Sequence, residues 1–336
     1  MSMKSPTLPF HLVNAFTPSK FGGNQAAVVL FDNGSEQDKR STDEDWMRLV
    51  ARDFNFSETA YLVPLEGAGG EGYYKDGEEE GNWGLRWFTP SEEVELCGHA
   101  TLASASTLFT LYPSLQRIAF QTRWSGILIS TRTKTSSGEA GIEIILPSFS
   151  PDVLAGLANG EFGQDRAEQV AGALGVDVEA VRDVSDIKFS GMPSIIVLLD
   201  SSVDVKGLKV DAKALGKISG GWFVTQIAPE SEDANADAGE TEKLYINSRV
   251  FGPGLGIDED PVTGSAHAYF TGYYLNSPAS KFLPSRFHTK QSDLGNVEIV
   301  GRQVSARGGL LRCKWDEGKV KIVGQAVEFA RGSLSS

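Results

Sequence analysis

Two short segments place a glycine directly ahead of a helical stretch, where the backbone can bind an anion. They are Cys97-Gly98-His99-Ala100 and Thr263-Gly264-Ser265-Ala266. Glycine lets the backbone approach a ligand closely, and the first turn of the following helix presents N–H groups without intrahelical partners. Such a helix start binds carboxylate groups well. One copy is commonly just a tight helix start, but two copies at matching places predict two helix N-termini arranged about one site.

The elements that must position these segments follow the same order in each half of the chain. In the first half we expect strands near 8–16 and 26–31, a helix near 43–53, strands at 59–64 and 84–89, and a helix in CGHATLASASTLF. In the second half we expect a strand at 194–200, a short helix at 211–218, strands at 221–228 and 243–251, and a helix in GSAHAYFTGYYL. This repeated order indicates a duplicated unit of helices and strands.

The net charge of −13 lies mostly in two segments, each between two of the expected strands. Residues 66–80 carry a net charge of −5 and residues 230–242 a net charge of −6, which is eleven of the thirteen charges. Both segments are rich in Gly, Ala and acidic residues, as solvated loops are. No basic stripe offsets them, which argues against nucleic acid as a partner and is compatible with a small anionic substrate.

Cysteine spacing and hydropathy exclude other classes of protein. Cys97 and Cys313 are too few and too far apart for a disulfide framework, and no CxxC or Cys/His spacing indicates a metal site. The N-terminal MSMKSPTLPFHLV lacks the apolar core of a secretory signal, and no run of 18 apolar residues exists. We therefore expect a soluble, cytoplasmic protein that binds neither a metal nor a membrane.

A glycine-rich stretch at 252–256, GPGLG, is similar to a dinucleotide-binding loop but lacks the full G-x-G-x-x-G spacing. Three acidic residues at 258–260 follow it and would repel a pyrophosphate. We interpret this stretch as a turn and expect no nucleotide cofactor.

Four longer segments carry a family resemblance: FGGNQAAVVLF at 21–31, FSETAYL at 56–62, LRWFTPSEEVELCGHATLASA at 85–105 and DEDPVTGSAHAYF at 258–270. In this order they resemble the phenazine biosynthesis PhzF-like family, which shares its fold with diaminopimelate epimerase. The resemblance implies an α+β fold of two pseudo-repeated domains, near 1–150 and 190–330, each a β-barrel-like sheet around a central helix. It allows the C-terminal strand to cross to the first domain. It also implies an active site in the cleft between the domains and a homodimer.

The resemblance assigns catalytic roles to three residues. In the phenazine enzyme the reaction is isomerisation by proton transfer, without a metal or organic cofactor. The catalytic glutamate of the family's Ser-Glu-Thr motif falls on Glu58, and its histidine in the Gly-His motif falls on His99. The aspartate of its Asp-Pro-Val-Thr-Gly-Ser motif falls on Asp260. The serine and glycine that hold the substrate carboxylate in the family fall on Ser265 and Gly264. We expect Asn24, Ser57 and Gly98 to bind the substrate as well.

Physical chemistry supports the role of Glu58, because Phe54, Phe56 and Tyr61 flank it and burial among them would raise its pKa towards working pH. An ordinary exposed glutamate at a strand edge is the alternative. The alternatives for the other two residues are a packed structural role for His99 and a helix cap for Asp260.

Two departures from related sequences bear on the chemistry. Diaminopimelate epimerases use a cysteine from each half as opposed acid and base, and here Cys97 occupies the first position but Thr263 the second. A hydroxyl is far too weak an acid to replace a thiol. Gln25 stands where the family usually has proline, which leaves the preceding Asn24 available for substrate.

The sequence therefore predicts a cofactor-independent isomerase that moves a proton within a small carboxylate-bearing substrate. Two alternatives stay open: a catalytically idle binding or scaffold protein, and an amino-acid epimerase or racemase. The intact Glu58, His99, Asp260 and Ser265 favour the isomerase, and Thr263 disfavours the epimerase.

Overall fold

The computed structural model describes residues 7–31, 38–65, 77–135, 138–157, 162–189, 191–228, 242–287 and 296–335. The two acidic segments lie mostly outside these ranges, at residues 66–76 and 229–241. By its internal contacts the chain divides into unit 1, Met1–Ile145 with Val323–Ser336, and unit 2, Leu146–Ile322. The C-terminal strand therefore belongs to unit 1.

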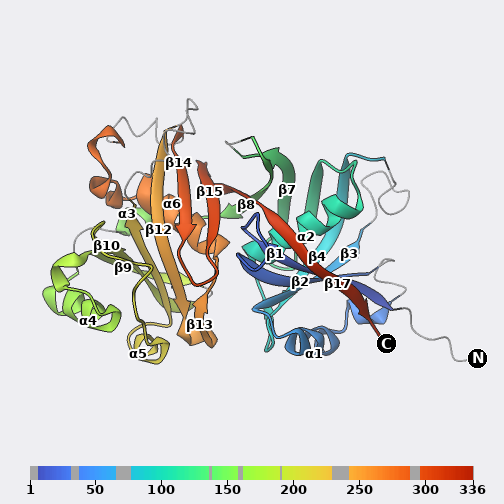
Figure 1. Ribbon diagram of the computed structural model, residues 1–336, viewed down its shortest axis with the longest axis horizontal. Coiled ribbons are helices and arrows are strands. Elements are labelled where there is room, and N and C mark those ends of the chain that lie inside the picture. Colours follow the sequence, from blue (N-terminus) through green and yellow to red (C-terminus); the bar gives the residue numbers. More distant parts are fainter. Residues whose placement is uncertain are drawn as a thin grey trace, which may run out of the picture. The chain divides into compact units, whose positions relative to one another are not determined.

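In the part that the structure describes, unit 1 packs a sheet with the α-helices α1 and α2 (Figure 1). Its elements are β1 (Leu8–Ala15), β2 (Asn24–Leu30), α1 (Glu44–Phe54), β3 (Glu58–Pro64), β4 (Glu80–Phe88), β5 (Glu93–Val94), α2 (Gly98–Leu111), β6 (Arg117–Gln121), β7 (Ile127–Lys134), most of β8 (Ala140–Pro147) and β17 (Ala326–Leu334). Neighbouring strands run in the order β17, β1, β2, β3, β4, β6, β7 and β8, with β5 added beside β4.

Unit 2 repeats this plan. Its elements are α3 (Pro151–Gly156), α4 (Gln164–Leu174), β9 (Val181–Phe189), β10 (Met192–Leu199), α5 (Ala212–Gly216), β11 (Gly221–Ile227), β12 (Lys243–Gly252), β13 (Ile257–Asp260), α6 (Gly264–Asn276), β14 (Glu298–Gln303), β15 (Gly309–Asp316) and most of β16 (Lys319–Gly324). The strand order β9, β10, β11, β12, β14, β15 matches that of β1, β2, β3, β4, β6, β7. In both series the second and third strands, and the fourth and fifth, are parallel. The predicted α+β fold of two pseudo-repeated halves is confirmed, with the sheet open rather than closed into a barrel.

The central helix of unit 1 is α2, and its sequence explains its burial. Small or apolar residues lie on every side of GHATLASASTLFTL, the pattern of a helix surrounded by protein. The helix contacts β1, β2, β3, β7 and β17. Thr101, Ser104 and Thr107 each donate a hydrogen bond to the carbonyl four residues earlier, so their hydroxyls are satisfied in the interior. The sheet therefore wraps around α2.

The outer helix α1 covers the other face of the same sheet. Asp43 caps its N-terminus by accepting a hydrogen bond from the Trp46 N–H. Its apolar face places Met47 and Ala51 against Tyr61 and other residues of β2, β3 and β4. In β3, alternate residues therefore face α1 and α2. Tyr61 faces α1, so Glu58, three residues earlier, faces α2.

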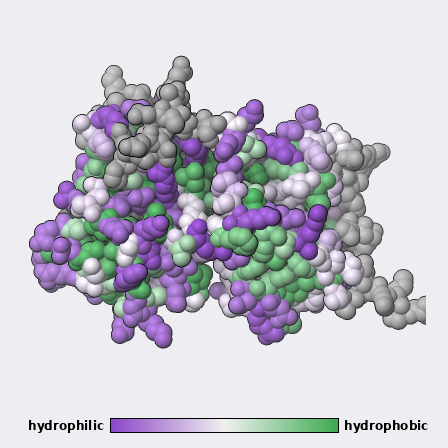
Figure 2. Space-filling model, viewed as in Figure 1, coloured by the Kyte–Doolittle hydropathy of each residue, from purple (hydrophilic) through white to green (hydrophobic). Residues whose placement is uncertain are grey.

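The helices of unit 2 show the same contrast. α6 is buried along most of its length, whereas α4 is amphipathic and packs Val170, Ala171 and Leu174 into a core. Figure 2 shows hydrophilic side chains over the outer surface of α4. Among the described residues, no helix combines the length and the apolarity needed to cross a membrane. The predicted turn at GPGLG is a single 3-10 turn, Pro253–Leu255.

Candidate active site

The first turn of α2 forms the base of the candidate site in unit 1. Cys97 precedes the helix in an extended conformation, with φ −142°, and its side chain does not cap the helix. The hydroxyl of Thr101 donates to the carbonyl of Cys97 at 2.6 Å, which fixes the start of the helix. The buried Gly98 and His99 follow as the first two helical residues. Their N–H groups lie at the positive end of the helix dipole, where a carboxylate binds well.

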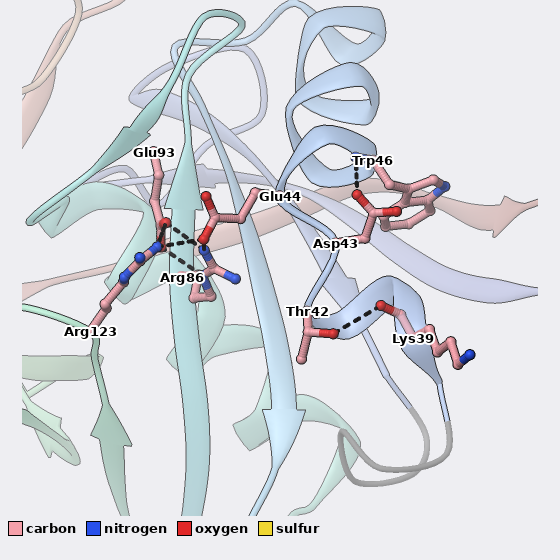
Figure 3. A network of polar contacts seen from close by, with 8 residues as sticks. All are labelled: Lys39, Thr42, Asp43, Glu44, Trp46, Arg86, Glu93 and Arg123. Carbon is pink, nitrogen blue, oxygen red and sulfur yellow. Dashed lines mark hydrogen bonds and ion pairs between the residues drawn. The ribbon is translucent and has the colours of Figure 1, made fainter.

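An ion-pair network holds the segment that leads into α2 (Figure 3). Arg86 in β4 donates from Nε to Glu93 in β5 at 2.6 Å, and Arg123 Nη1 lies 2.9 Å from the same carboxylate. Glu44, the first residue of α1, contacts both arginines. Glu93 is only 7% exposed, whereas Glu44 is 56% exposed. The network ties β5, and through it the start of α2, to α1 and to the sheet.

Glu58 and His99 face each other at this helix start. His99 Nε2 lies 3.2 Å from Glu58 Oε2, and Ser57 Oγ lies 3.4 Å from the same nitrogen. The side chains of His99 and Glu58 are 6% and 15% exposed. Oε2 of Glu58 is buried and has no aligned hydrogen bond to any described residue. A buried carboxylate oxygen with an uncommitted lone pair is suited to accept a proton from a ligand.

Asn24 determines which nitrogen of His99 carries the proton. Asn24 Nδ2 lies 3.2 Å from His99 Nδ1. An amide nitrogen can only donate, so Nδ1 accepts and the proton of the neutral ring is on Nε2. The Nε2–H group then lies beside the carboxylate of Glu58 without an aligned hydrogen bond to Oε2. Asn24, which the sequence suggests as a substrate ligand, therefore also orients His99.

The pKa of Glu58 shifts in the predicted direction. Burial raises the pKa of this carboxyl, and hydrogen bonds from Ser57 and Cys97 oppose the rise. The sequence-based reason was wrong for Tyr61, which is three residues away in β3 and so projects from the opposite face. Tyr61 donates to the carbonyl of Met47 in α1 at 2.5 Å. The desolvation of Glu58 comes instead from its position against the start of α2.

The start of α6 in unit 2 is built like the start of α2. Thr263 precedes the helix in an extended conformation and does not cap it with its side chain. His267 Nδ1 donates to the Thr263 carbonyl at 2.8 Å, as Thr101 does for the residue that precedes α2. Gly264 is buried and Ser265 half-buried at the first two positions of the helix. Each unit therefore contains one of the two predicted glycine-led helix starts.

The segment from Asp260 to Thr263 is held by Gln303 and Ser305, two residues that the sequence motifs did not indicate. The carboxylate of Asp260 accepts from Thr263 Oγ1 at 2.5 Å, and Asp260 is not the N-cap of α6, because Thr263 is. Gln303, buried in β14, accepts from the Thr263 N–H at 2.8 Å and donates to the Asp260 carbonyl at 2.5 Å. Ser305 donates to the Pro261 carbonyl at 2.7 Å. The only sequence signal for Gln303 was a polar residue at the end of an apolar run, EIVGRQ.

The structure thus brings the predicted site residues together in two groups. Around the start of α2 in unit 1 lie Asn24, Ser57, Glu58, Gly98 and His99. Around the start of α6 in unit 2 lie Asp260, Gly264 and Ser265. The first group carries the buried acid–base pair, and the second presents hydroxyl, carboxylate and backbone groups.

Comparisons with known protein sequences agree with this arrangement. The family model described as phenazine biosynthesis-like protein, PhzC-PhzF, matches residues 13–332. An uncharacterized isomerase of Halalkalibacterium halodurans is 32% identical over 340 residues, which cover 98% of each chain. A phenazine biosynthesis-like domain-containing protein of Homo sapiens is 32% identical over 342 residues, which cover 98% of this chain and 99% of the relative.

Solved structures show the same fold. A PhzF family protein of Enterococcus faecalis matches with a TM-score of 0.70 and 27% identity, over 98% of this chain and 100% of that one. A hydroxyproline epimerase from Agrobacterium vitis matches with a TM-score of 0.52 and 10% identity, over 99% of this chain and 94% of that one. At that identity the second likeness concerns the fold alone.

Proposed function

The chain belongs to the phenazine biosynthesis-like protein family, and from that premise we propose that it is an isomerase that moves a proton within a small carboxylate-bearing substrate. Two bacterial relatives of similar length are named isomerases, which supports an isomerase-like role at the level of the family. The proton transfer and the class of substrate are argued from the site of this chain.

Glu58 is the proposed proton carrier. Its carboxylate takes a proton from a carbon of the substrate, and the electron pair of that C–H bond moves into an adjacent unsaturated system. The protonated carboxyl then returns the proton to another carbon of the same system, where a new C–H bond forms. Atoms and electrons balance within the substrate, so the step needs no oxidant or reductant. His99 Nε2–H, with its nitrogen 3.2 Å from Oε2, stabilises the carboxylate before it takes the proton and again after it has returned it.

The helix starts are the proposed carboxylate sites. In unit 1 the N–H groups around Gly98 can donate to a substrate carboxylate, and in unit 2 the N–H groups around Gly264 and the hydroxyl of Ser265 offer donors of the same kind. Asp260 accepts from a polar substituent such as an amine or a hydroxyl. A substrate with a carboxylate and an unsaturated, cyclic body suits these groups.

One observation carries the proposal: Oε2 of Glu58 is buried, has no aligned hydrogen bond to the described residues, and lies beside an imidazole N–H. A carboxylate with only a structural role would have its buried oxygens hydrogen-bonded. The epimerase alternative needs a second thiol, and Thr263 instead donates its hydroxyl to Asp260. The remaining rival is a protein that binds the same ligands without reacting with them.

The experiment that separates these two functions is a ligand screen followed by exchange in deuterium oxide. Anthranilate-like and amino-acid-like carboxylates are first ranked by the increase in melting temperature that they cause. Stabilising ligands are then incubated with the protein in deuterium oxide and followed by NMR. We expect a shifted double bond, with deuterium at the carbon that receives the proton. Ligands that stabilise the protein and stay chemically unchanged would show that it only binds them.

A further inference from the structure

Glu58, Cys97 and His99 form a compact group of metal-ligand atoms in unit 1. One ligand atom of each residue lies within 4.8 Å of those of the other two. Glu58 begins β3, whereas the other two residues lie at the start of α2. The fold brings Glu58 beside the other two residues. The usual spacing of zinc ligands along a sequence therefore could not have revealed this group.

We propose that these three residues bind Zn²⁺ and that the bound ion inhibits the enzyme. The inhibition rests on the proposed function of Glu58, whereas the binding does not. Thiolate and imidazole ligands select Zn²⁺ over hard cations such as Mg²⁺, and three protein ligands leave a fourth position open for water.

The spacing of Cys97 and His99 already suits a tetrahedral zinc ion. Zn–S and Zn–N bonds of about 2.3 and 2.0 Å at a tetrahedral angle separate the two ligand atoms by about 3.5 Å. Cys97 Sγ lies 3.5 Å from His99 Nδ1. Neither side chain needs to move far for both to contact one ion.

The chemical state of the group also favours a divalent cation. His99 Nδ1 carries the lone pair of the neutral ring, which accepts from Asn24 Nδ2 and which the ion would take over in place of that hydrogen bond. Glu58 supplies a buried oxygen that has no aligned hydrogen bond to the described residues. Cys97 loses one proton to solvent as the ion binds. Two negative ligands then neutralise the two charges of Zn²⁺, so the buried site carries no net charge.

Zinc binding conflicts with the proposed proton transfer. A Zn–O bond would occupy the lone pair with which Glu58 accepts the substrate proton. The ion would also hold Glu58 and His99 in one arrangement through both steps. Zn²⁺ therefore inhibits in a way that a chelator reverses.

The test uses metal-free full-length protein, with Zn²⁺ in calorimetry and Co²⁺ as a spectroscopic probe. We expect one Zn²⁺ per chain, no binding of Mg²⁺, and a near-ultraviolet thiolate-to-cobalt band. Cys97→Ser should abolish that band and weaken Zn²⁺ binding by at least the roughly 10–100-fold that loss of a supporting contact costs. Cys313→Ser, which changes the other buried thiol, is the matched control and should keep both.

Glu58→Gln is a second variant that keeps the side-chain shape, and it should also bind Zn²⁺ more weakly. With the substrate found by the exchange screen, wild-type turnover should fall as Zn²⁺ is added and recover with EDTA. Absence of Zn²⁺ binding, or a cobalt band that persists in Cys97→Ser, would overturn the site. Turnover that is unchanged or raised by saturating Zn²⁺ would overturn the inhibition. The binding result stands apart from the proposed isomerase activity, because it needs no substrate.

Discussion

The imidazole of His267 lies against the backbone of Gly301, in the space that any larger residue at 301 would fill. A Cβ there would lie 2.3 Å from His267 Cδ2 and 2.7 Å from Nε2. The ring is fully buried, and its nitrogens contact the Thr263 carbonyl at 2.8 Å and Ser248 Oγ at 3.3 Å. Held at both nitrogens, the ring cannot turn away. Gly301 in β14 thus makes room for the histidine that supports the start of α6.

Gly301→Ala should therefore destabilise the protein by about 1–3 kcal/mol, the usual cost of forcing extra volume into a packed core. Chemical denaturation of the variant measures this free energy of unfolding. Gly172→Ala is the matched control, because Gly172 is exposed within α4 and its Cβ would meet nothing within 4 Å. That change should stabilise by about 0.5–1 kcal/mol through helix propensity. Equal effects of the two substitutions would contradict the contact with His267.

His267 should make the protein less stable in mild acid. Burial lowers its pKa from 6.5 to about 4, so the native state stays neutral where the unfolded chain takes up a proton. The stability that depends on the neutral ring is complete above pH 6.5 and is lost as the pH falls towards 4. The loss is about 3 kcal/mol. The free energy of unfolding measured across this range should fall more steeply for the wild type than for His267→Gln. Parallel curves for the two proteins would exclude His267 as the cause.

The network that leads into α2 should depend on Glu93 and hardly on Glu44. Glu93→Gln leaves Arg86 and Arg123 without their shared, nearly buried carboxylate, so the melting temperature should drop by several degrees. Glu44→Gln removes an exposed partner of the same two arginines and should change the melting temperature little. A larger drop in melting temperature for Glu44→Gln than for Glu93→Gln would show that Glu44, and not Glu93, holds the network together.

Phe21 should be a site of local strain. It has φ +71°, a left-handed conformation that disfavours residues with a side chain, and it is 80% exposed. Phe21→Gly relieves the strain, whereas Phe21→Ala removes the ring and keeps the strain. Denaturation should show the glycine variant to be more stable than the alanine variant by about 1 kcal/mol. An alanine variant that is at least as stable would show that the loop relaxes without cost.

Much of the fold could be predicted because its signals are local. The apolar runs of β1, β2, β3, β10 and β11 and the small, apolar helices α2 and α6 are visible in the sequence, and their order revealed the repeat. The later hairpins of each half, β6 with β7 and β14 with β15, were missed. Their strands are short and carry mixed polarity, as in RIAFQ and GLLRCKWD, and their partners are distant in sequence.

The site was predicted unevenly for a related reason. Short motifs pointed to Glu58, His99 and Asp260, because each lies beside residues of a recognisable pattern. Residues that act through tertiary contacts gave no such pattern. Gln303 reaches Asp260 across 43 positions of the chain, and only the folded sheet shows the link. The contact of Cys97 with His99 depends in the same way on how the helix begins.

The central claim is that Glu58 carries the proton, and Glu58→Gln tests it because glutamine keeps the size and hydrogen-bonding reach of the side chain while removing the basic oxygen. Glu92→Gln, an exposed glutamate of the segment before α2, is the matched control. Both variants should still bind the carboxylate ligand, since binding is assigned to the helix starts and Ser265.

The decisive measurement is the turnover of these two variants beside the wild type, with the substrate found by the exchange screen. We expect Glu58→Gln to lose on the order of a thousandfold in rate, within the usual range for a general base, while Glu92→Gln stays at the wild-type rate. Near wild-type turnover by Glu58→Gln would show that Glu58 does not carry the proton. Asp260 would then be the candidate base, and Asp260→Asn should show the loss that Glu58→Gln did not.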